Sequence, residues 1–378
     1  MPLRIGIVTE YYYPLLGGIS ENVHHTATEL AARGHTVTIV STNPPANGLT
    51  LAMPNGIPTR RVGRSVRIYG NGAMAHFASG AQLWRDLRQV LEQERFDIVQ
   101  LHSPLFFTLP PLVTLLARCA RVGTFHSYFE PSLTYSLFKS VLQKQFVNRL
   151  EGVTVVSQSV REALSRYFEF DARVIPNGVD TAMFNPRVAP LARFGPEKRT
   201  LLFLGRFDPR NGLPFMLHAF AKVRQRVGDV RLVVVGTGPL DSVYRAMVPE
   251  HLRDDVHFEG AALINRPSYY ASSDIFCSPI RNASFGITLL EAMASGTPIV
   301  ATDNVGYRDL LAAEGLLVPY EVEAFADAIV QLLSDDRLRV SMREAGLRRA
   351  EHYAWPVVVT HLLDYFAEVL AGKCAVSC

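Results

Sequence analysis

The chain has 378 residues, of which 48% are hydrophobic and 19% are charged, and its formal net charge is +3. This length exceeds what one hydrophobic core comfortably serves, so two domains are expected. The composition excludes an intrinsically disordered chain, and the weak net charge without a Lys/Arg run argues against nucleic acid as a partner.

The sequence also limits the cellular location. The longest apolar stretch, 105–117, is interrupted by Pro110 and Pro111 and is too short to span a bilayer. The N-terminus has no signal-peptide architecture, and the C-terminal Cys-Ala-Val-Ser-Cys does not fit the prenylation pattern. We therefore expect a cytoplasmic protein that is soluble or at most peripheral at the inner face of the membrane.

The first half of the chain alternates apolar strands with helical stretches. A continuous apolar strand over 3–8 is followed by the pair Gly17-Gly18, a helical pattern and a strand over 36–40. Further buried strands are expected over 98–101, 121–125, 153–156 and 173–175. Because such alternation forms a parallel sheet covered on both faces, residues 1–185 are predicted to be a doubly wound, Rossmann-like domain.

A second alternating set begins near residue 198. The preceding segment, 185–198, contains three prolines and no apolar period, as is typical of a linker. Strands are then expected over 201–205, 231–235, 256–258, 275–278, 298–301 and 316–318. Residues 198–354 are therefore predicted to be a second α/β domain of the same class, facing the first across a ligand cleft.

Gly17 and Gly18 lie after the first strand, at the edge where doubly wound sheets bind ligands. Glycines at this place let backbone N–H groups approach a phosphate or a sugar, although such a pair is more often a structural turn. The chain contains no G-x-G-x-x-G motif, so a nicotinamide cofactor is not expected.

Three features together are the most informative part of the sequence. Residues 282–296, Asn-Ala-Ser-Phe-Gly-Ile-Thr-Leu-Leu-Glu-Ala-Met-Ala-Ser-Gly, read as a glycine turn that opens a helix before a buried strand. Gly205-Arg206 joins a strand to a helix, where a guanidinium can bind a diphosphate bidentately. His126 follows the strand 121–125. This combination resembles the retaining glycosyltransferases of family four, above all the phosphatidylinositol mannosyltransferases.

The resemblance extends from Ile5 to about Leu370 and implies the two-domain GT-B fold. In that fold the C-terminal helix, here 355–378, packs back on the N-terminal, acceptor-side domain, and the second domain binds the nucleotide sugar. The implied reaction moves a sugar from a GDP- or UDP-linked donor to a lipid or glycan acceptor, with retention of anomeric configuration. It needs no cofactor, and the absence of a D-x-D motif agrees with metal-independent chemistry.

The resemblance also assigns roles to individual residues. His126 would contact a hydroxyl of the donor sugar, Arg206 the departing diphosphate, and Glu291 the ribose hydroxyls. The ordinary alternatives are a satisfied polar histidine, a surface arginine and a generic helix glutamate. Backbone amides at the start of the helix would face the phosphates, namely those of Phe285, Gly286 and Ile287.

Two positions depart from the family pattern. The lysine expected five residues after the arginine is Asn211, and the first glutamate of the Glu-x7-Glu motif is Ala283. Arg210 and Arg281 lie beside these positions, and we expect them to compensate for the lost lysine and to alter sugar recognition. The alternatives are a degenerate homologue that binds a nucleotide sugar or a partner without efficient turnover, and a phosphorylase or epimerase, whose cofactor lysine or acid pair is missing.

The segment 133–150 is amphipathic and carries Lys139, Lys144 and Arg149. These features suit contact with an anionic membrane, with the solvated face of an ordinary helix as the equal alternative.

Overall fold

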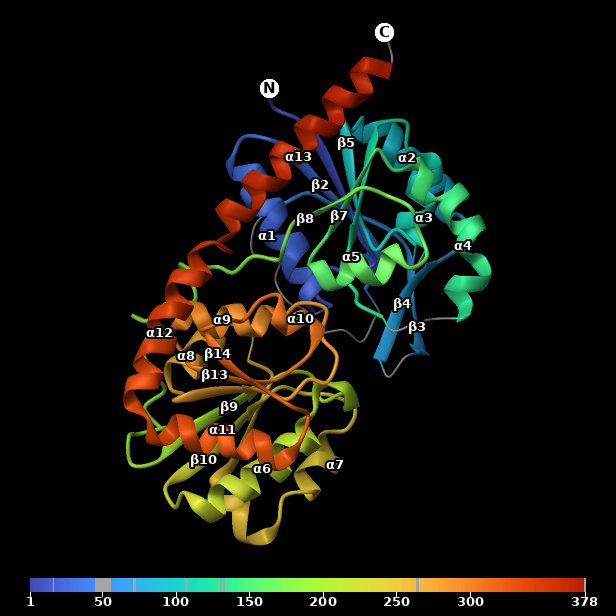
Figure 1. The fold of residues 1–378 in the computed structure, drawn as a ribbon. Coiled ribbons are helices and arrows are strands. Elements are labelled where there is room, and N and C mark those ends of the chain that lie inside the picture. Colours follow the sequence, from blue (N-terminus) through green and yellow to red (C-terminus); the bar gives the residue numbers. More distant parts are fainter. Residues whose placement is uncertain are drawn as a thin grey trace. The chain divides into compact units, whose positions relative to one another are not determined.

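The computed structural model describes residues 1–15, 17–44, 56–70, 73–105, 108–129, 131, 133–262 and 265–376. The chain forms two compact units (Figure 1). The first unit contains Met1–Asn177 and Trp355–Cys378, and the second contains Gly178–Ala354. Each unit is an α/β fold built on a largely parallel sheet, so the prediction of two doubly wound domains is confirmed.

The first unit contains an eight-stranded sheet in the order β4-β3-β2-β1-β5-β6-β7-β8, in which only β3 and β4 pair antiparallel. Its strands are β1 (Arg4–Val8), β2 (Thr36–Asn43), β3 (Thr59–Gly70), β4 (Ala73–Ser79), β5 (Ile98–His102), β6 (Ala120–Phe125), β7 (Gly152–Val155) and β8 (Ala172–Val174). Its helices are α1 (Gly18–Ala32), α2 (Leu83–Glu94), α3 (Leu109–Leu116), α4 (Leu133–Gln145), η1 (Val147–Arg149), α5 (Gln158–Ser165) and α13 (Trp355–Val376). The central strand β1 is an apolar run because it is covered on both faces.

Helix α13 belongs to the core of the first unit, although it is the last element of the chain. Its buried side chains, among them Val359 and Phe366, pack in one cluster with Ile5 and Ile7 of β1. The hydroxyl of Tyr365 accepts a hydrogen bond from the backbone N–H of Val153 at 2.9 Å. The helix therefore packs back on the N-terminal unit through both apolar and polar contacts.

The second unit contains a six-stranded parallel sheet in the order β11-β10-β9-β12-β13-β14. Its strands are β9 (Arg199–Leu204), β10 (Val230–Val235), β11 (Val256–Gly260), β12 (Ile275–Ser278), β13 (Ile299–Thr302) and β14 (Gly315–Val318). Its helices are η2 (Pro209–Asn211), α6 (Leu213–Arg226), α7 (Asp241–Ala246), η3 (Glu250–Asp255), α8 (Arg266–Ala271), α9 (Ile287–Ser295), α10 (Val305–Arg308), α11 (Val322–Ser334) and α12 (Asp336–Glu351). One continuous core packs α6 and α11 on the sheet.

The boundary between the units differs from the predicted one. Residues 178–185, assigned to the first domain by sequence, belong to the second unit. The backbone N–H of Val179 donates to the carbonyl of Tyr353 at 2.8 Å, and the buried ring of Phe184 packs against Tyr270. The proline-rich segment that follows also lies within the second unit, because its backbone is anchored there. For example, Leu191 N–H donates to the Ser272 hydroxyl at 2.7 Å.

Among the residues that the structure describes, no helix has the length and apolar character needed to cross a membrane.

Two valines of α13 test how much this helix stabilises the first unit. Val359 is fully buried, whereas Val357 is 38% exposed on the same helix. We expect Val359→Ala to lower the free energy of unfolding by about 2 kcal/mol, since buried methyl groups are lost and a cavity remains. Val357→Ala is the control and should change it by less than about 0.5 kcal/mol. Both tryptophans, Trp84 and Trp355, lie in the first unit, so urea denaturation followed by tryptophan fluorescence reports on that unit. Equal effects of the two changes would contradict the packing of α13.

Candidate functional site

The loops after β9, β10 and β12 meet at the carboxyl edge of the second sheet in direct backbone contact. A Cβ atom at Gly236 would lie 1.9 Å from the carbonyl oxygen of Gly205, and one at Gly212 would lie 2.3 Å from that of Pro279. Both glycines have positive φ, 149° and 77°. Larger residues cannot occupy these positions without moving the loops. The three loops are thus held together at the edge where open α/β sheets bind ligands.

Arg206 lies in the loop after β9 and is held by a carboxylate that the sequence analysis did not identify. Its guanidinium is 2.9 Å from Asp208 Oδ2, and the Asp208 side chain is only 5% exposed. The Arg206 side chain itself is 47% exposed. The guanidinium therefore forms an ion pair with a buried carboxylate while about half of the side chain stays accessible. The signal in the sequence was the acidic residue two positions after the arginine in a strand-to-helix turn.

Asn211, which stands where the family pattern has lysine, makes a structural hydrogen bond. Its Nδ2 donates to the backbone carbonyl of Arg206 at 2.7 Å. The amide therefore fixes the conformation of the Arg206 turn and does not leave a gap in it. The neighbouring Arg210 is exposed in η2. No ion pair of Arg210 is found within the described part of the chain.

The start of α9 presents backbone N–H groups at the end of a loop. Gly286 directly precedes this helix, and Ile287 is its first residue. Among the described residues, no side chain caps its first turn. The ring of Phe285 is buried and lies 6.1 Å from the ring of Tyr353, which anchors the loop before the helix. Uncapped N–H groups at a helix N-terminus favour an anion.

Glu291 lies one turn into α9 and both of its oxygens face protein groups. The Tyr270 hydroxyl donates to Oε2 at 2.8 Å, and Arg266 is 3.3 Å from Oε1. Burial and then the charge of Glu291 raise the pKa of Tyr270 well above its ordinary value. Tyr270 and Arg266 were not identified from the sequence.

The loop that carries Arg281 and Ala283 is held by hydrogen bonds from side chains that follow or end β13. Its carbonyl at Ile280 accepts hydrogen bonds from the Thr302 hydroxyl at 2.6 Å and from Asn304 Nδ2 at 2.9 Å. Ala283 is 9% exposed, so its methyl group is packed into the unit. The guanidinium carbon of Arg281 lies 5.7 Å from the centre of the Tyr320 ring. Arg281 is thus an exposed cation supported by an aromatic face.

In the first unit, Gly17 immediately precedes α1 and Gly18 begins it. A Cβ atom built at Gly17 would meet nothing within 4 Å. The space beside this turn is open, so packing does not explain the small residue. Leu16 lies outside the described residues.

His126 follows β6 and forms a pair with His102, the last residue of β5. His102 Nδ1 and His126 Nε2 are 2.7 Å apart, and the rings are stacked at 4.9 Å. Burial lowers the pKa of His126 to about 4 and that of His102 well below its ordinary value, so both rings are neutral at pH 7. His102 Nε2 is buried without a hydrogen-bond partner among the described residues. Burying an unprotonated ring nitrogen without a partner costs less free energy than burying an N–H without one. We therefore infer that His102 carries its proton on Nδ1 and donates it to His126 Nε2.

Glu10, directly beyond β1, is a second buried titratable group at this edge of the first sheet. Its Oε1 accepts from the backbone N–H groups of Thr108 and Leu109, each at 2.7 Å, at the start of α3. Burial raises the pKa of Glu10 to about 7, against the opposing effect of these amides. The sequence analysis did not assign Glu10 a role.

Comparison with known proteins places the whole chain in one family. Residues 16–183 match the model of "Glycosyltransferase Family 4", and residues 198–335 match that of "Glycosyl transferases group 1". The chain is 33% identical to the phosphatidyl-myo-inositol mannosyltransferase of Mycobacterium tuberculosis strain H37Rv, over 98% of both chains. It belongs to the family 4 glycosyltransferases. The predicted family and the assignment as a transferase enzyme are thereby confirmed.

Other relatives and solved structures agree. The glycosyltransferase is 28% identical to the alpha-monoglucosyldiacylglycerol synthase of Streptococcus pneumoniae, over 93% of this chain and 85% of that one. Anabaena HepE in complex with UDP and glucose superposes with a TM-score of 0.79 at 18% identity, covering 97% and 99% of the two chains. A glycosyltransferase from Rickettsia africae superposes with a TM-score of 0.76 at 19% identity, covering 97% and 98%. These similarities confirm the GT-B fold.

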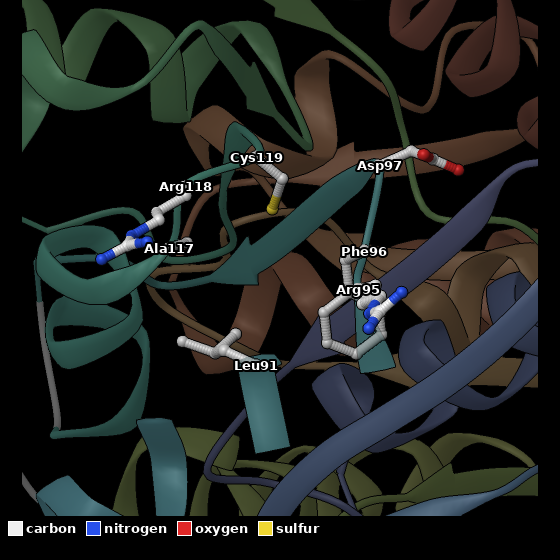
Figure 2. Close-up of a pocket in the computed structure, with 7 residues that line it drawn as sticks. All are labelled: Leu91, Arg95, Phe96, Asp97, Ala117, Arg118 and Cys119. Atoms are coloured by element: carbon white, nitrogen blue, oxygen red, sulfur yellow. The ribbon is translucent and has the colours of Figure 1, made fainter. Parts of the chain in front are cut away.

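The glycosyltransferase also has a pocket at the opposite edge of the first sheet. It lies where β5 and β6 begin and is lined by Leu91, Arg95, Phe96, Asp97, Ala117, Arg118 and Cys119. Figure 2 shows the Asp97 carboxylate and the Arg118 guanidinium on opposite sides of this pocket. Since His102 and His126 lie at the other ends of the same two strands, the pocket is separate from the candidate site.

The buried histidine pair predicts a pH dependence of stability. Between pH 6.5 and about 4, unfolded His126 binds a proton that folded His126 does not, so stability falls as pH falls through this window. When the pH is lowered from 6.5 to 5, we expect the free energy of unfolding of the natural protein to fall. That of His126→Gln should fall by about 1–2 kcal/mol less. Tryptophan fluorescence in urea at several pH values measures the difference. His361→Gln changes an exposed histidine of the same unit and should leave the slope unaltered. If the free energy of unfolding of His126→Gln depended on pH as steeply as that of the natural protein, His126 would not be desolvated in the folded state.

Proposed function

We propose that this glycosyltransferase transfers a sugar from a nucleoside diphosphate sugar to a lipid acceptor, with retention of anomeric configuration and without a metal ion. The observation that carries the proposal is the pairing of Arg206 with buried Asp208 beside the glycine-locked loops of the second unit. A preorganised guanidinium at this edge suits a diphosphate leaving group, because it need not reorganise as charge develops.

Three arginines supply the charge for the donor. Arg206, Arg210 and Arg281 are exposed beside loops at the carboxyl edge of the second sheet, and Asp208 offsets one of these charges. The remaining two positive charges would balance the two negative charges of the donor diphosphate, with Arg210 and Arg281 as the proposed substitutes for the missing lysine. The uncapped amides of Phe285, Gly286 and Ile287 add a neutral source of positive potential.

Glu291 is the proposed ribose ligand in this arrangement. Tyr270 and Arg266 hold its carboxylate in one orientation, which would direct it toward the ribose hydroxyls. A GDP-linked donor and a UDP-linked donor would each supply the required ribose hydroxyls. The complex of HepE with UDP and glucose supports a nucleotide donor, and the mannosyltransferase relatives support mannose as one candidate sugar.

The acceptor is proposed from the names of the relatives, a phosphatidyl-myo-inositol mannosyltransferase and a synthase of alpha-monoglucosyldiacylglycerol. A glycan acceptor is the second possibility. In the retaining reaction the departing diphosphate takes the acceptor proton on the same face of the sugar. His126 would bind a hydroxyl of the donor sugar, and the open turn at Gly17 and Gly18 would admit a ligand to the backbone of α1. We propose a cytoplasmic protein that works peripherally at the inner face of the membrane.

Arg206→Ala tests the diphosphate assignment. We expect turnover to fall at least a hundredfold, since loss of such a donor costs roughly 2.7–4 kcal/mol in the transition state. Release of free nucleotide from a panel of GDP- and UDP-sugars, with lipid acceptors in detergent, measures the rate. Arg253→Ala removes an exposed arginine on η3 and is the matched control. Circular dichroism must show that both variants are folded, because Arg206→Ala leaves the Asp208 carboxylate buried without its partner. An unchanged kcat/KM would remove Arg206 from the diphosphate.

Arg281→Ala tests whether the altered positions reflect altered specificity. We expect activity on the true donor to fall at least tenfold, which corresponds to about 1.4 kcal/mol. Arg187→Ala changes an exposed arginine elsewhere in the unit and should have no effect. The double change Asn211→Lys with Ala283→Glu provides the opposite test. If it creates strong transfer where the natural chain has none on any donor, the protein is a degenerate homologue and the proposal fails.

A further inference from the structure

Helix α4 of the first unit exposes a line of large apolar side chains. Leu133, Leu137 and Val141 are 75%, 70% and 57% exposed, and Phe138 beside them is 55% exposed. The three aliphatic residues are spaced four apart, so they lie on one face of the helix. We call these four residues the α4 face. Such a concentration on one short helix is unusual for a free surface, where exposed apolar residues occur singly.

The opposite side of α4 holds the helix on its unit. Tyr135 is 9% exposed, and its ring lies 4.7 Å from the Phe129 ring and 5.5 Å from the Tyr167 ring. Tyr135 is two residues from both Leu133 and Leu137, which places it on the other side of the helix. The α4 face is therefore directed outward while the helix itself is anchored. Figure 1 shows α4 at the periphery of the first unit.

Helix α4 and the segment that follows it carry only positive charges. Lys139, Lys144 and Arg149 are exposed, and residues 131–150 contain no aspartate or glutamate. Lysine and arginine stems can lie along an apolar surface while their charged groups reach anionic headgroups. An apolar line with cationic side chains on the same helix is the pattern of a helix that lies in a membrane interface.

The position of α4 relates this surface to the candidate site. The helix begins seven residues after His126, which follows β6 at the carboxyl edge of the first sheet. A lipid that enters this edge would therefore leave a membrane close to α4. The 13 residues of α4 span about 20 Å along the surface, enough to contact several headgroups at once.

We propose that the α4 face docks the protein on an anionic bilayer, with the four apolar side chains inserted at the level of the headgroups and acyl carbons. This inference rests on the proposed lipid acceptor, because docking would deliver that acceptor to the first unit. A second copy of the chain is the other candidate occupant, but the cations beside the face would repel their equivalents across a symmetric contact.

The experiment measures binding to vesicles without any sugar donor. The natural protein is floated with vesicles of phosphatidylcholine containing 30% phosphatidylglycerol and with vesicles of phosphatidylcholine alone. We expect binding to the anionic vesicles and at least fivefold less to the neutral ones. Leu137→Gln with Val141→Gln should reduce anionic binding at least fivefold. Val243→Gln with Val340→Gln is the matched control, since these valines are 51% and 55% exposed on the second unit.

The outcomes separate docking from catalysis. Circular dichroism and the urea midpoint should be unchanged in both double variants, and so should release of nucleotide with a detergent-dispersed acceptor. Equal flotation of the α4 variant and the natural protein would overturn the proposal. So would a concentration-dependent dimer that only the α4 variant loses. If vesicle binding behaves as expected while no donor is turned over, docking stands and the proposed function fails.

Discussion

The candidate site depends on backbone contacts between neighbouring loops of the second sheet. Gly236 lies against the Gly205 carbonyl and Gly212 against the Pro279 carbonyl, and neither contact leaves space for a Cβ atom. The loops after β10, β9 and β12 are consequently packed backbone against backbone. Arg206 takes its direction from this framework, and Asn211 and Asp208 complete it by binding the backbone and the guanidinium of the same residue. A transition-state charge can be stabilised only by groups that are already in place, and the glycines provide that condition.

Much of the fold could be predicted because buried parallel strands are continuous apolar runs. The exceptions have physical causes. Strands β3 and β4 form the antiparallel edge of the first sheet, and β3 contains four arginines, so no apolar run marks it. The segment 185–198 resembles a linker because prolines and polar residues dominate it, yet local hydrogen bonds such as that of Leu191 to Ser272 attach it to the second unit. Composition shows which residues prefer solvent, but not which backbone groups find a partner.

The site residues divide in the same way. Arg206 and His126 were predicted because each follows a strand, and Glu291 because it lies in a helix opened by a glycine turn; the family resemblance supplied the roles predicted for them. Their partners could not be predicted, since these come from other elements. His102 reaches His126 only because β5 and β6 pair with His102 opposite Thr124, and Tyr270 reaches Glu291 across 21 residues of sequence. Local patterns place one side chain at a strand end, whereas strand order and register decide which side chain lies beside it.

The two departures from the family pattern are integrated into the structure. Asn211 makes a hydrogen bond that fixes the Arg206 turn, and Ala283 is packed in a loop held by Thr302 and Asn304. Restoring a lysine at 211 would bring a charge but would remove the amide, and a glutamate at 283 would have to displace packed atoms or leave the loop. The arrangement therefore leaves Arg210 and Arg281 as the exposed cations beside the two altered positions, which is the basis of the proposed donor recognition by arginine.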